Sequence, residues 1–362
     1  MYYSILTCYY RSKPGGFCKR LFRGIQALLD HGHTVHYLAV VPFPIEHPNC
    51  HFHRFPWPKN YTSGYLFWGI FHLLAPILLL YVGFRYKINR LFAFGHSYSL
   101  FLQPLRVIKH IPLTLFLRGD TLAKHKTTGR PDVLIKLEHY LEGIGIAGTK
   151  MYGVSRILTN KVSTRHVFLQ PKKIGILRND IPQYAVIKRA KCIQFPLRVA
   201  SVGMLEPGKN QRFLINIFKK IPREKAHLYL YGTGPDEKSL QKVVQQEKMS
   251  DQIHFMGWVQ PEYIWPEVDL LLMPSLHEGA PNAVLEALGH EIAVLASNIP
   301  EHAEILPMKY LCSLDDIKEW EKRIKSFIDS SDARMQEFVR EQKAVTQQLT
   351  FDWEINFVRC VV

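Results

Sequence analysis

The sequence has few cysteines, and those it has are scattered. Six cysteines stand among 362 residues, and no two of them form a C-x-x-C pair. Zinc sites and disulfide scaffolds need cysteines at close, defined spacings, so both are disfavoured and a reducing cytoplasm is the expected compartment. The first residues also lack a charged segment followed by an apolar segment and a cleavage site, so we expect no secretory signal.

Acidic residues are scarce in the first half of the chain. Residues 1–180 contain 24 Lys and Arg against 7 Asp and Glu, whereas residues 181–362 contain 22 against 24. Such a basic region is typical of proteins whose partners are nucleic acids, anionic membranes or phosphorylated substrates. The sequence has neither zinc-finger spacing nor an aromatic RNA-binding signature, so we expect no nucleic-acid partner.

One long segment, residues 64–84, has no Lys, Arg, Asp or Glu. Its 21 residues suffice to span a bilayer, although Pro76 in the middle favours a buried or interfacial helix. Three alternatives stay open: a core or surface-docked helix, a monotopic membrane contact, and a transmembrane helix. In the second and third cases, Arg85, Lys87 and Arg90 would favour an anionic headgroup layer.

Strand-like and helix-length segments alternate along both halves of the chain. In the first half we predict strands at 2–8, 35–41, 90–94, 113–117, 151–154 and 173–177, and a helix at 17–30. In the second half we predict strands at 197–202, 227–231, 252–255, 270–273 and 293–296, and helices at 210–220, 236–248, 281–290 and 315–328. This alternation predicts two doubly wound α/β domains. The predicted boundaries are a first domain at 1–180, a linker at 181–196, a second domain at 197–332 and a helical tail at 333–362.

The most specific motif is PSLHEGAPNAVLEA at residues 274–287, which directly follows an apolar strand-like run. It predicts a strand, a tight loop and a helix, with Gly279 permitting close backbone approach. Glu278 would lie in the loop at the edge of the sheet, and Glu286 would lie in the helix. Two carboxylates at this spacing can accept hydrogen bonds from different hydroxyl groups of one elongated ligand.

The start of the same helix is a second candidate ligand contact. Pro281, which has no N–H of its own, suits a first helical turn, and the other backbone N–H groups around 280–283 are expected to attract phosphate or sugar oxygens. Ala280 and Asn282 belong to this set.

The motif resembles the two-glutamate signature of retaining GT-B glycosyltransferases, especially glycosyltransferase family four. In that family the first Glu and the following backbone amides hold the donor sugar, and the second Glu holds the ribose hydroxyls. The resemblance implies these roles for Glu278 with residues 279–281 and for Glu286. It also implies two Rossmann-like domains that face each other across a cleft.

Residues 201–210, SVGMLEPGKN, resemble the family segment whose Lys neutralises the donor diphosphate, which implies that role for Lys209. Positive charge there would offset the charge that builds on a departing nucleoside diphosphate. The sequence departs from the family where Met204 replaces a frequent Arg and where Glu291 replaces a usual Gly. Other family-like landmarks are YGTGP at 231–235, IHFMG at 253–257, SNIPEH at 297–302 and FDWE at 351–354.

The first half carries weaker resemblances. Gly16, in PGGF at 14–17, resembles the glycine loop that approaches the donor phosphates. Arg118 stands where the family often has a His near the reacting sugar, so it cannot act as a neutral imidazole but could hold a phosphate or the acceptor. Asp120 follows closely, and His96 is an alternative polar group for the cleft.

The resemblance implies transfer of a hexose from a UDP- or GDP-sugar to a glycan or lipid-linked acceptor. Retention of configuration and independence of metals and other cofactors are implied with it. Charge and the apolar segment add an expectation of lipopolysaccharide-type synthesis, peripheral to the inner face of the cytoplasmic membrane. One alternative is a GT-B-shaped nucleotide-sugar-binding protein without turnover, and another is a membrane- or polyanion-binding protein whose motif is vestigial.

Overall fold

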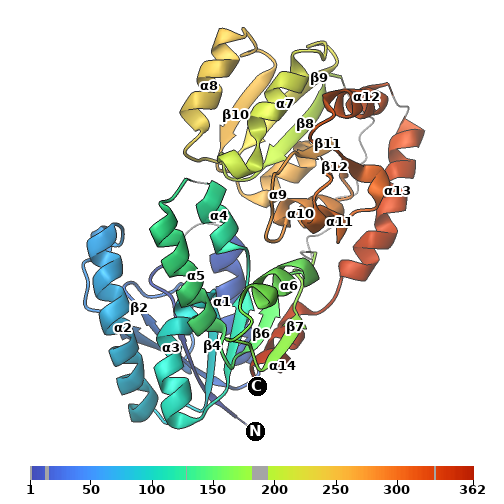
Figure 1. Ribbon diagram of the computed structural model, residues 1–362. Helices are drawn as coiled ribbons and strands as arrows, with labels where there is room; N and C mark the ends of the chain where they lie inside the picture. The colour runs from blue at the N-terminus through green and yellow to red at the C-terminus, as the bar shows by residue number, and fades with distance from the viewer. Residues whose placement is uncertain (1, 13–15, 128, 182–194, 330–331) are drawn as a thin grey trace. The chain divides into compact units, whose positions relative to one another are not determined.

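The computed structural model describes residues 2–12, 16–127, 129–181, 195–329 and 332–362 (Figure 1). The chain divides into two compact units, one formed by residues 1–178 with 352–362 and the other by residues 179–351. Each unit is built on a parallel sheet with helices packed on it. The predicted α/β class with two Rossmann-like domains is confirmed.

The first unit has a seven-stranded parallel sheet in the order β3-β2-β1-β4-β5-β6-β7. The strands are β1 (Ser4–Cys8), β2 (Thr34–Ala39), β3 (Cys50–Arg54), β4 (Arg90–Phe94), β5 (Leu113–Leu117), β6 (Lys150–Gly153) and β7 (Lys173–Ile176). Central strands such as β5, with the sequence LTLFL, are buried along their whole length because helices cover both faces of the sheet. Strand β3 was not predicted, since CHFHR at the sheet edge is too polar to read as a buried strand.

Helices cover both faces of this sheet. They are α1 (Gly16–Asp30), α2 (Tyr65–Arg85), α3 (His96–Lys109), α4 (Thr121–Thr127), α5 (Asp132–Ile146), α6 (Arg156–Arg165) and α14 (Trp353–Val361), with a short 3-10 helix at Lys59–Tyr61. Helices α2, α3 and α5 pack side by side, and α14 packs against α1 and strands β4 and β5 (Figure 1).

The predicted helical tail at 333–362 is two helices in different units. Helix α13 (Asp332–Leu349) belongs to the second unit, whereas α14 belongs to the first. The ring of Phe357 in α14 packs within 4.8 Å of Phe116 and 5.6 Å of Phe92, measured between ring centroids. Burial of this aromatic cluster is what docks the end of the chain on the first sheet.

Helix α2 contains residues 65–84 of the uncharged segment and ends at Arg85, and it lies on the first unit with one stripe buried. Its buried residues, Phe67, Phe71, Ala75, Leu79, Val82 and Gly83, recur at helical spacing. Among the described residues, α2 is the one helix whose length and composition would allow it to cross a membrane.

The second unit has a six-stranded parallel sheet in the order β10-β9-β8-β11-β12-β13. The strands are β8 (Leu197–Val202), β9 (Ala226–Tyr231), β10 (Ile253–Gly257), β11 (Leu270–Met273), β12 (Ala293–Ser297) and β13 (Leu311–Cys312). The remaining helices are α7 (Gln211–Phe218), α8 (Glu237–Gln246), α9 (Pro261–Ile264), α10 (Asn282–Gly289), α11 (Pro300–Ala303) and α12 (Ile317–Ile328), with 3-10 turns at Pro207–Lys209, Trp265–Glu267 and Met308–Tyr310.

The two sheets share one topological feature. In each, the strand order reverses beside the first strand of the unit, between β1 and β4 in one and between β8 and β11 in the other. Loops that leave neighbouring strands in opposite directions open a crevice at the carboxyl edge of such a sheet, and ligands of open α/β sheets bind there. The loops after these strands carry most of the predicted site residues.

Candidate active site

Lys209 and Glu278 meet at the carboxyl edge of the second sheet. Lys209 ends the 3-10 turn after β8, and Glu278 lies in the loop after β11, the neighbouring strand. The Lys209 Nζ atom is 2.6 Å from Glu278 Oε1, and the side chains are 21% and 4% exposed. Two residues 69 positions apart in the sequence therefore form one nearly buried ion pair at the switch point of the sheet.

Glu278 is held as an anion with one oxygen open. Ser275 Oγ donates a second hydrogen bond to the same Oε1 atom, at 2.7 Å. Burial alone would raise the pKa of Glu278, but the Lys209 ammonium and the Ser275 hydroxyl outweigh it, so the pKa lies below its usual value. Within the described part of the chain, Oε2 accepts no hydrogen bond, so it can accept one from a ligand hydroxyl.

Backbone contacts between loops fix the position of Lys209. The Leu276 N–H donates to the Gly208 carbonyl at 2.9 Å, which ties the loop after β11 to the turn that carries Lys209. Gly232, in the predicted YGTGP turn, has a φ of +128°, and a Cβ atom there would lie 2.0 Å from the Gly203 carbonyl oxygen. A side chain cannot be accommodated at Gly232 without moving the loop that leads to Lys209.

The start of α10 offers fewer free donors than the sequence predicts. Pro281 is the N-cap, and the Asn282 N–H donates to the Ala280 carbonyl at 2.8 Å, so that donor is used. The N–H groups of Ala280 and Ala283 make no hydrogen bond to other described residues and stay available to a ligand. The Asn282 side chain accepts a hydrogen bond from Asn179 Nδ2, at 2.5 Å.

Glu286 is part of α10 and half-buried, and Gly279 precedes the helix in the same loop as Glu278. The structure thus places the predicted residues 278–282 and 286 on one loop and helix, next to Lys209.

His302 belongs to this site, although the sequence analysis names it only within a landmark segment. Its side chain is fully buried, and Nδ1 is 2.9 Å from the Ser297 carbonyl oxygen. Because a carbonyl can only accept, Nδ1 carries the proton and Nε2 is an acceptor, and Nε2 has no partner in the described part of the chain. Burial lowers the pKa of His302 despite the favourable field of Glu278, so the ring is neutral at pH 7.

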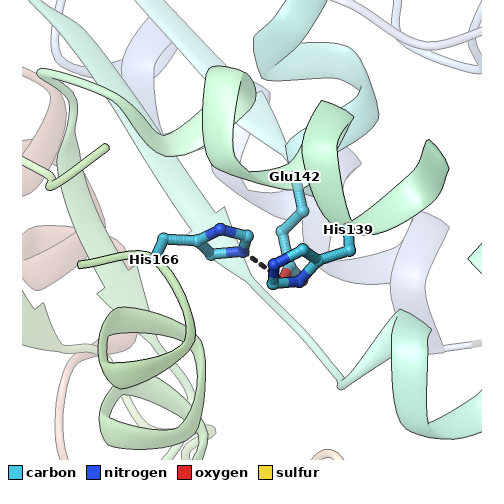
Figure 2. Close-up of side chains that lie close together, drawn as sticks. All are labelled: His139, Glu142 and His166. Atoms are coloured by element: carbon cyan, nitrogen blue, oxygen red, sulfur yellow. Dashed lines mark hydrogen bonds and ion pairs between the residues drawn. The ribbon is translucent and has the colours of Figure 1, made fainter. Parts of the chain in front are cut away.

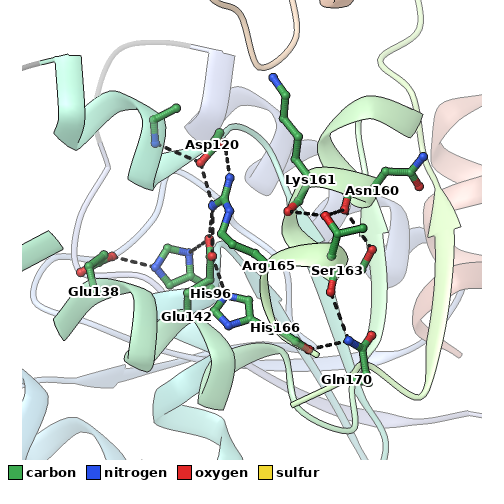
Figure 3. Close-up of polar contacts among 12 residues, drawn as sticks. His96, Asp120, Glu138, Glu142, Asn160, Lys161, Ser163, Arg165, His166 and Gln170 are labelled. Carbon is green, nitrogen blue, oxygen red and sulfur yellow. Dashed lines mark hydrogen bonds and ion pairs between the residues drawn. The ribbon is translucent and has the colours of Figure 1, made fainter. Parts of the chain in front are cut away.

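In the first unit, the predicted Asp120 lies in a network of charges at the carboxyl edge of the sheet (Figure 3). Arg165, at the end of α6, binds both carboxylate oxygens of Asp120 and also lies 3.1 Å from Glu142 Oε2. Asp120 Oδ1 further accepts from the Ala123 N–H at the start of α4. Burial raises the pKa of Asp120, but the Arg165 guanidinium outweighs that effect and the net pKa is below its usual value.

His96, the first residue of α3, joins the same network from the neighbouring strand. It is 4% exposed, with Nε2 2.7 Å from Glu138 Oε1 and Nδ1 3.9 Å from Glu142 Oε1. The hydrogen bond from His96 lowers the pKa of Glu138. Both ring nitrogens of His96 therefore face carboxylates of α5, an arrangement that suits a positioning role better than direct contact with a ligand.

A cluster of His139, Glu142 and His166 lies beside these residues (Figure 2). Their ligand atoms are within 4.8 Å of one another, and two imidazoles with one carboxylate form a donor set that zinc accepts. Glu142 Oε2, however, already accepts from His166 Nε2 at 2.8 Å and from Arg165. A dication next to that guanidinium would be strongly repelled, so we interpret the cluster as part of the charge network.

Two further predicted residues lie just after a strand and at the start of a helix in the first unit. Arg118 directly follows β5 and is half-buried, and Gly16 begins α1. The other residues of the predicted glycine loop, Pro14 and Gly15, lie outside the described residues.

Comparison with known proteins finds similarity to a known family within the second unit. Residues 196–330 match the family model of the group 1 glycosyl transferases. The sequence is 27% identical over 171 residues to the O-antigen biosynthesis glycosyltransferase WclY of Escherichia coli, a match covering 45% of this chain and 47% of that protein. The chain thus spans about half the length of the curated relatives that it matches.

Solved structures resemble almost the whole chain. Sucrose-phosphate synthase from Thermosynechococcus elongatus superposes with a TM-score of 0.78 at 16% identity, covering 99% of this chain and 97% of that one. Anabaena HepE in complex with UDP-glucose superposes with a TM-score of 0.72 at 15% identity, with the same coverage. At these identities the likeness shows the fold, which is GT-B.

Proposed function

We propose that the chain is a group 1 glycosyltransferase that moves a hexose from a UDP- or GDP-sugar to a glycan or lipid-linked acceptor. The observation that carries the proposal is the pair Lys209 and Glu278 at the switch point of the second sheet. The match of residues 196–330 supports the transfer reaction, and HepE with UDP-glucose supports a nucleotide-sugar donor. The likeness to WclY favours an acceptor in O-antigen or lipopolysaccharide synthesis.

The two charged residues of the site bind different parts of the donor: Glu278 binds the sugar and Lys209 binds the diphosphate. The Glu278 carboxylate, ionised at neutral pH, accepts hydrogen bonds from sugar hydroxyls through its open Oε2 atom. The Lys209 ammonium has three donors, and the ion pair with Glu278 leaves the others for the diphosphate. As the glycosidic bond of the donor breaks, negative charge grows on the diphosphate, and a fixed ammonium in a nearly buried site stabilises that charge.

Retention of configuration and independence of metals are further parts of the proposal. Lys209 and the open N–H groups of Ala280 and Ala283 supply positive charge and hydrogen-bond donors that a divalent ion would otherwise supply. The resemblance to retaining enzymes supports the stereochemistry.

We also propose that the first unit binds the anionic inner face of the cytoplasmic membrane through the solvent-exposed face of α2. Leu66, Leu73, Ile77, Tyr81 and Phe84 of that face are each more than half exposed. Arg85 ends the helix and Lys87 follows it, and residues 1–180 carry a large excess of positive charge. An apolar face with flanking cations has the chemistry of an interfacial helix.

The donor test measures release of nucleoside diphosphate from a panel of UDP- and GDP-sugars in the presence of membrane-extract acceptors. We expect release with one donor, little effect of a chelator, and loss of release in Lys209→Ala. The anomeric configuration of the product, read by NMR, tests retention. Donor binding without release for any acceptor would instead favour a nucleotide-sugar-binding protein.

The membrane test is separate. Flotation with vesicles of phosphatidylcholine and phosphatidylglycerol should recover the parent protein but not Leu73→Glu/Ile77→Glu. Unchanged flotation of that variant would rule out the solvent-exposed face of α2 as the contact.

A further inference from the structure

A basic pocket lies at the amino edge of the first sheet, the edge opposite to the one that carries the charge network. Strands β5, β6 and β7 begin there, and α3 ends there. The pocket has a volume of about 670 Å³. Its lining residues are Arg106, Val107, His110, Ile111, Pro112, Leu113, Gly148, Lys150, Lys172 and Lys173.

The charges of the pocket are all of one sign. Arg106, Lys150, Lys172 and Lys173 line it without an Asp or Glu among the lining residues. Lys150 and Lys173 are register partners on adjacent strands, so their side chains leave the sheet on the same face. Burial, followed by the fields of Arg90, Lys173 and Lys172, lowers the pKa of Lys150 against an opposing effect of Cys360, as expected where several cations crowd together.

None of these four cations forms an ion pair with a carboxylate in the described part of the chain. Arg106 uses Nε to donate to Gln103 Oε1 at 2.5 Å, and its two terminal nitrogens have no protein partner there. Those nitrogens form the forked end of the guanidinium, the part that binds oxyanions with two parallel hydrogen bonds.

The backbone is shaped to hold Arg106 in place. Gly148 has a φ of +65°, and a Cβ atom there would lie 2.6 Å from Arg106 Nη1. The Gly148 N–H donates to the Gln170 carbonyl at 2.9 Å, and the Lys172 N–H donates to the Thr149 carbonyl at 2.8 Å. A glycine turn thus lets the guanidinium lie against the main chain, and the turn is fixed before any ligand arrives.

We propose that this pocket binds a phosphate group, presented by a soluble phosphate or by a lipid headgroup. Four cations without counter-ions cost free energy in the folded protein, and a phosphate with up to two negative charges offsets that cost. The exposed Val107 and the neighbouring Ile111 give the pocket an apolar wall for the carbon part of a phosphate ester. The site lies in the first unit and does not depend on the glycosyltransferase proposal.

The test is isothermal titration calorimetry of the full chain with inorganic phosphate. Arg106→Gln should weaken phosphate binding about tenfold or more, since a charge-assisted hydrogen bond is worth roughly 1.5–3 kcal/mol. Lys150→Gln/Lys173→Gln should do the same, and it keeps the result interpretable if the Arg106 variant folds poorly. Lys59→Gln/Lys136→Gln is the matched control, because both lysines belong to the same unit, lie outside the pocket and are exposed.

Two more arms separate the competing phosphate sites and sources. Lys209→Ala should leave this binding unchanged, because it removes the cation of the other candidate phosphate site. A lipid headgroup is the source if two results coincide. The parent protein floats with phosphatidylglycerol-containing vesicles and Arg106→Gln does not, and inorganic phosphate does not bind. Binding of inorganic phosphate that the pocket variants weaken would identify a soluble phosphate. The proposal is overturned if neither probe binds, or if the pocket variants bind both as the parent does.

Discussion

The carboxyl edges of the two sheets share a topology, but the charged side chains at the two edges are paired differently. In the second unit, Lys209 and Glu278 pair while Glu278 Oε2 stays open to a ligand. In the first unit, Arg165 binds Asp120 and Glu142, and His96 and His166 bind the glutamates of α5. One edge keeps hydrogen-bonding capacity open to a ligand, whereas the described charges of the other are largely satisfied by one another.

The two sets of charges therefore stabilise different things, a bound ligand in the second unit and the fold of the loops in the first. A buried carboxylate with an open oxygen contributes to binding a ligand, so its removal should cost activity more than stability. A buried network in which each charge has a partner contributes to the fold of the loops that carry it, so removing one member leaves the others uncompensated.

The largest expected effect on stability follows from Arg165→Ala. Asp120 and Glu142 would lose their shared cation inside the unit, which should reduce the free energy of unfolding by about 3–5 kcal/mol. Urea denaturation at neutral pH measures it, and Arg54→Ala, an exposed arginine of the same unit, serves as control. Nearly equal midpoints for the two variants would show that the network does not stabilise the fold.

The difference in stability between the parent protein and Arg165→Ala should be smaller at acid pH. The folded pKa of Asp120 lies below its ordinary value of 3.8, so its ion pair stabilises the fold fully above that pH. That stabilisation is lost as the pH falls from there through the folded pKa. The gap in stability between the parent and Arg165→Ala should therefore narrow below about pH 4.

The largest expected effect on activity follows from Glu278→Gln. The substitution keeps the shape of the side chain but removes the charge that pairs with Lys209 and accepts from a ligand hydroxyl. We expect kcat for diphosphate release to fall about 10²–10³-fold, as for loss of one preorganised polar group at a reacting centre. Glu262→Gln, at an exposed position of the same unit, should retain full activity. If Glu278→Gln stays active, the site assignment is wrong.

The comparison also explains which parts of the site the sequence could predict. Lys209 and Glu278 each follow a strand in a short local motif. Because parallel strands bring such loops together at one edge of a sheet, the local pattern alone is enough to predict that these two residues meet. The network around Arg165 joins four separate segments with no fixed spacing. Asp120 and His96 are predicted as site residues because each follows a strand. The partners that hold them, Arg165 and Glu138, lie 45 and 42 residues further along the chain. Tertiary packing, which no local pattern encodes, selects those partners.

The fold shows the same limit. Apolar strands in the sheet interiors were predicted within a few residues, because burial on both faces leaves a continuous hydrophobic run. The packing of α14 on the first unit was not predicted. It depends on contact between Phe357 and aromatic residues such as Phe116, which lie hundreds of residues earlier in the chain.

A smaller effect is expected from Ser275→Ala, which removes one hydrogen bond to Glu278. The loss of a bond to a charged group should reduce kcat/KM by roughly tenfold, less than the loss of the charge itself. Because the Ser275 hydroxyl helps to lower the pKa of Glu278, the acid limb of the pH profile should also move to higher pH. Ser201→Ala, a buried serine of β8, is the control and should leave that limb in place.

The smallest effect is expected at His302, whose Nε2 atom is a buried acceptor and whose ring lies within the electrostatic field of Glu278. In His302→Asn the side chain can still bond to the Ser297 carbonyl, but it no longer presents an acceptor at the Nε2 position. If a donor-sugar hydroxyl uses that acceptor, KM for the donor should rise severalfold, on the order of 1 kcal/mol, with kcat little changed. Since burial holds the pKa of His302 below 6.5, donor affinity of the parent should be constant above that pH and fall only below it. An unchanged KM in His302→Asn, with a melting temperature near that of the parent, would leave His302 as a packing residue of the loop after β12.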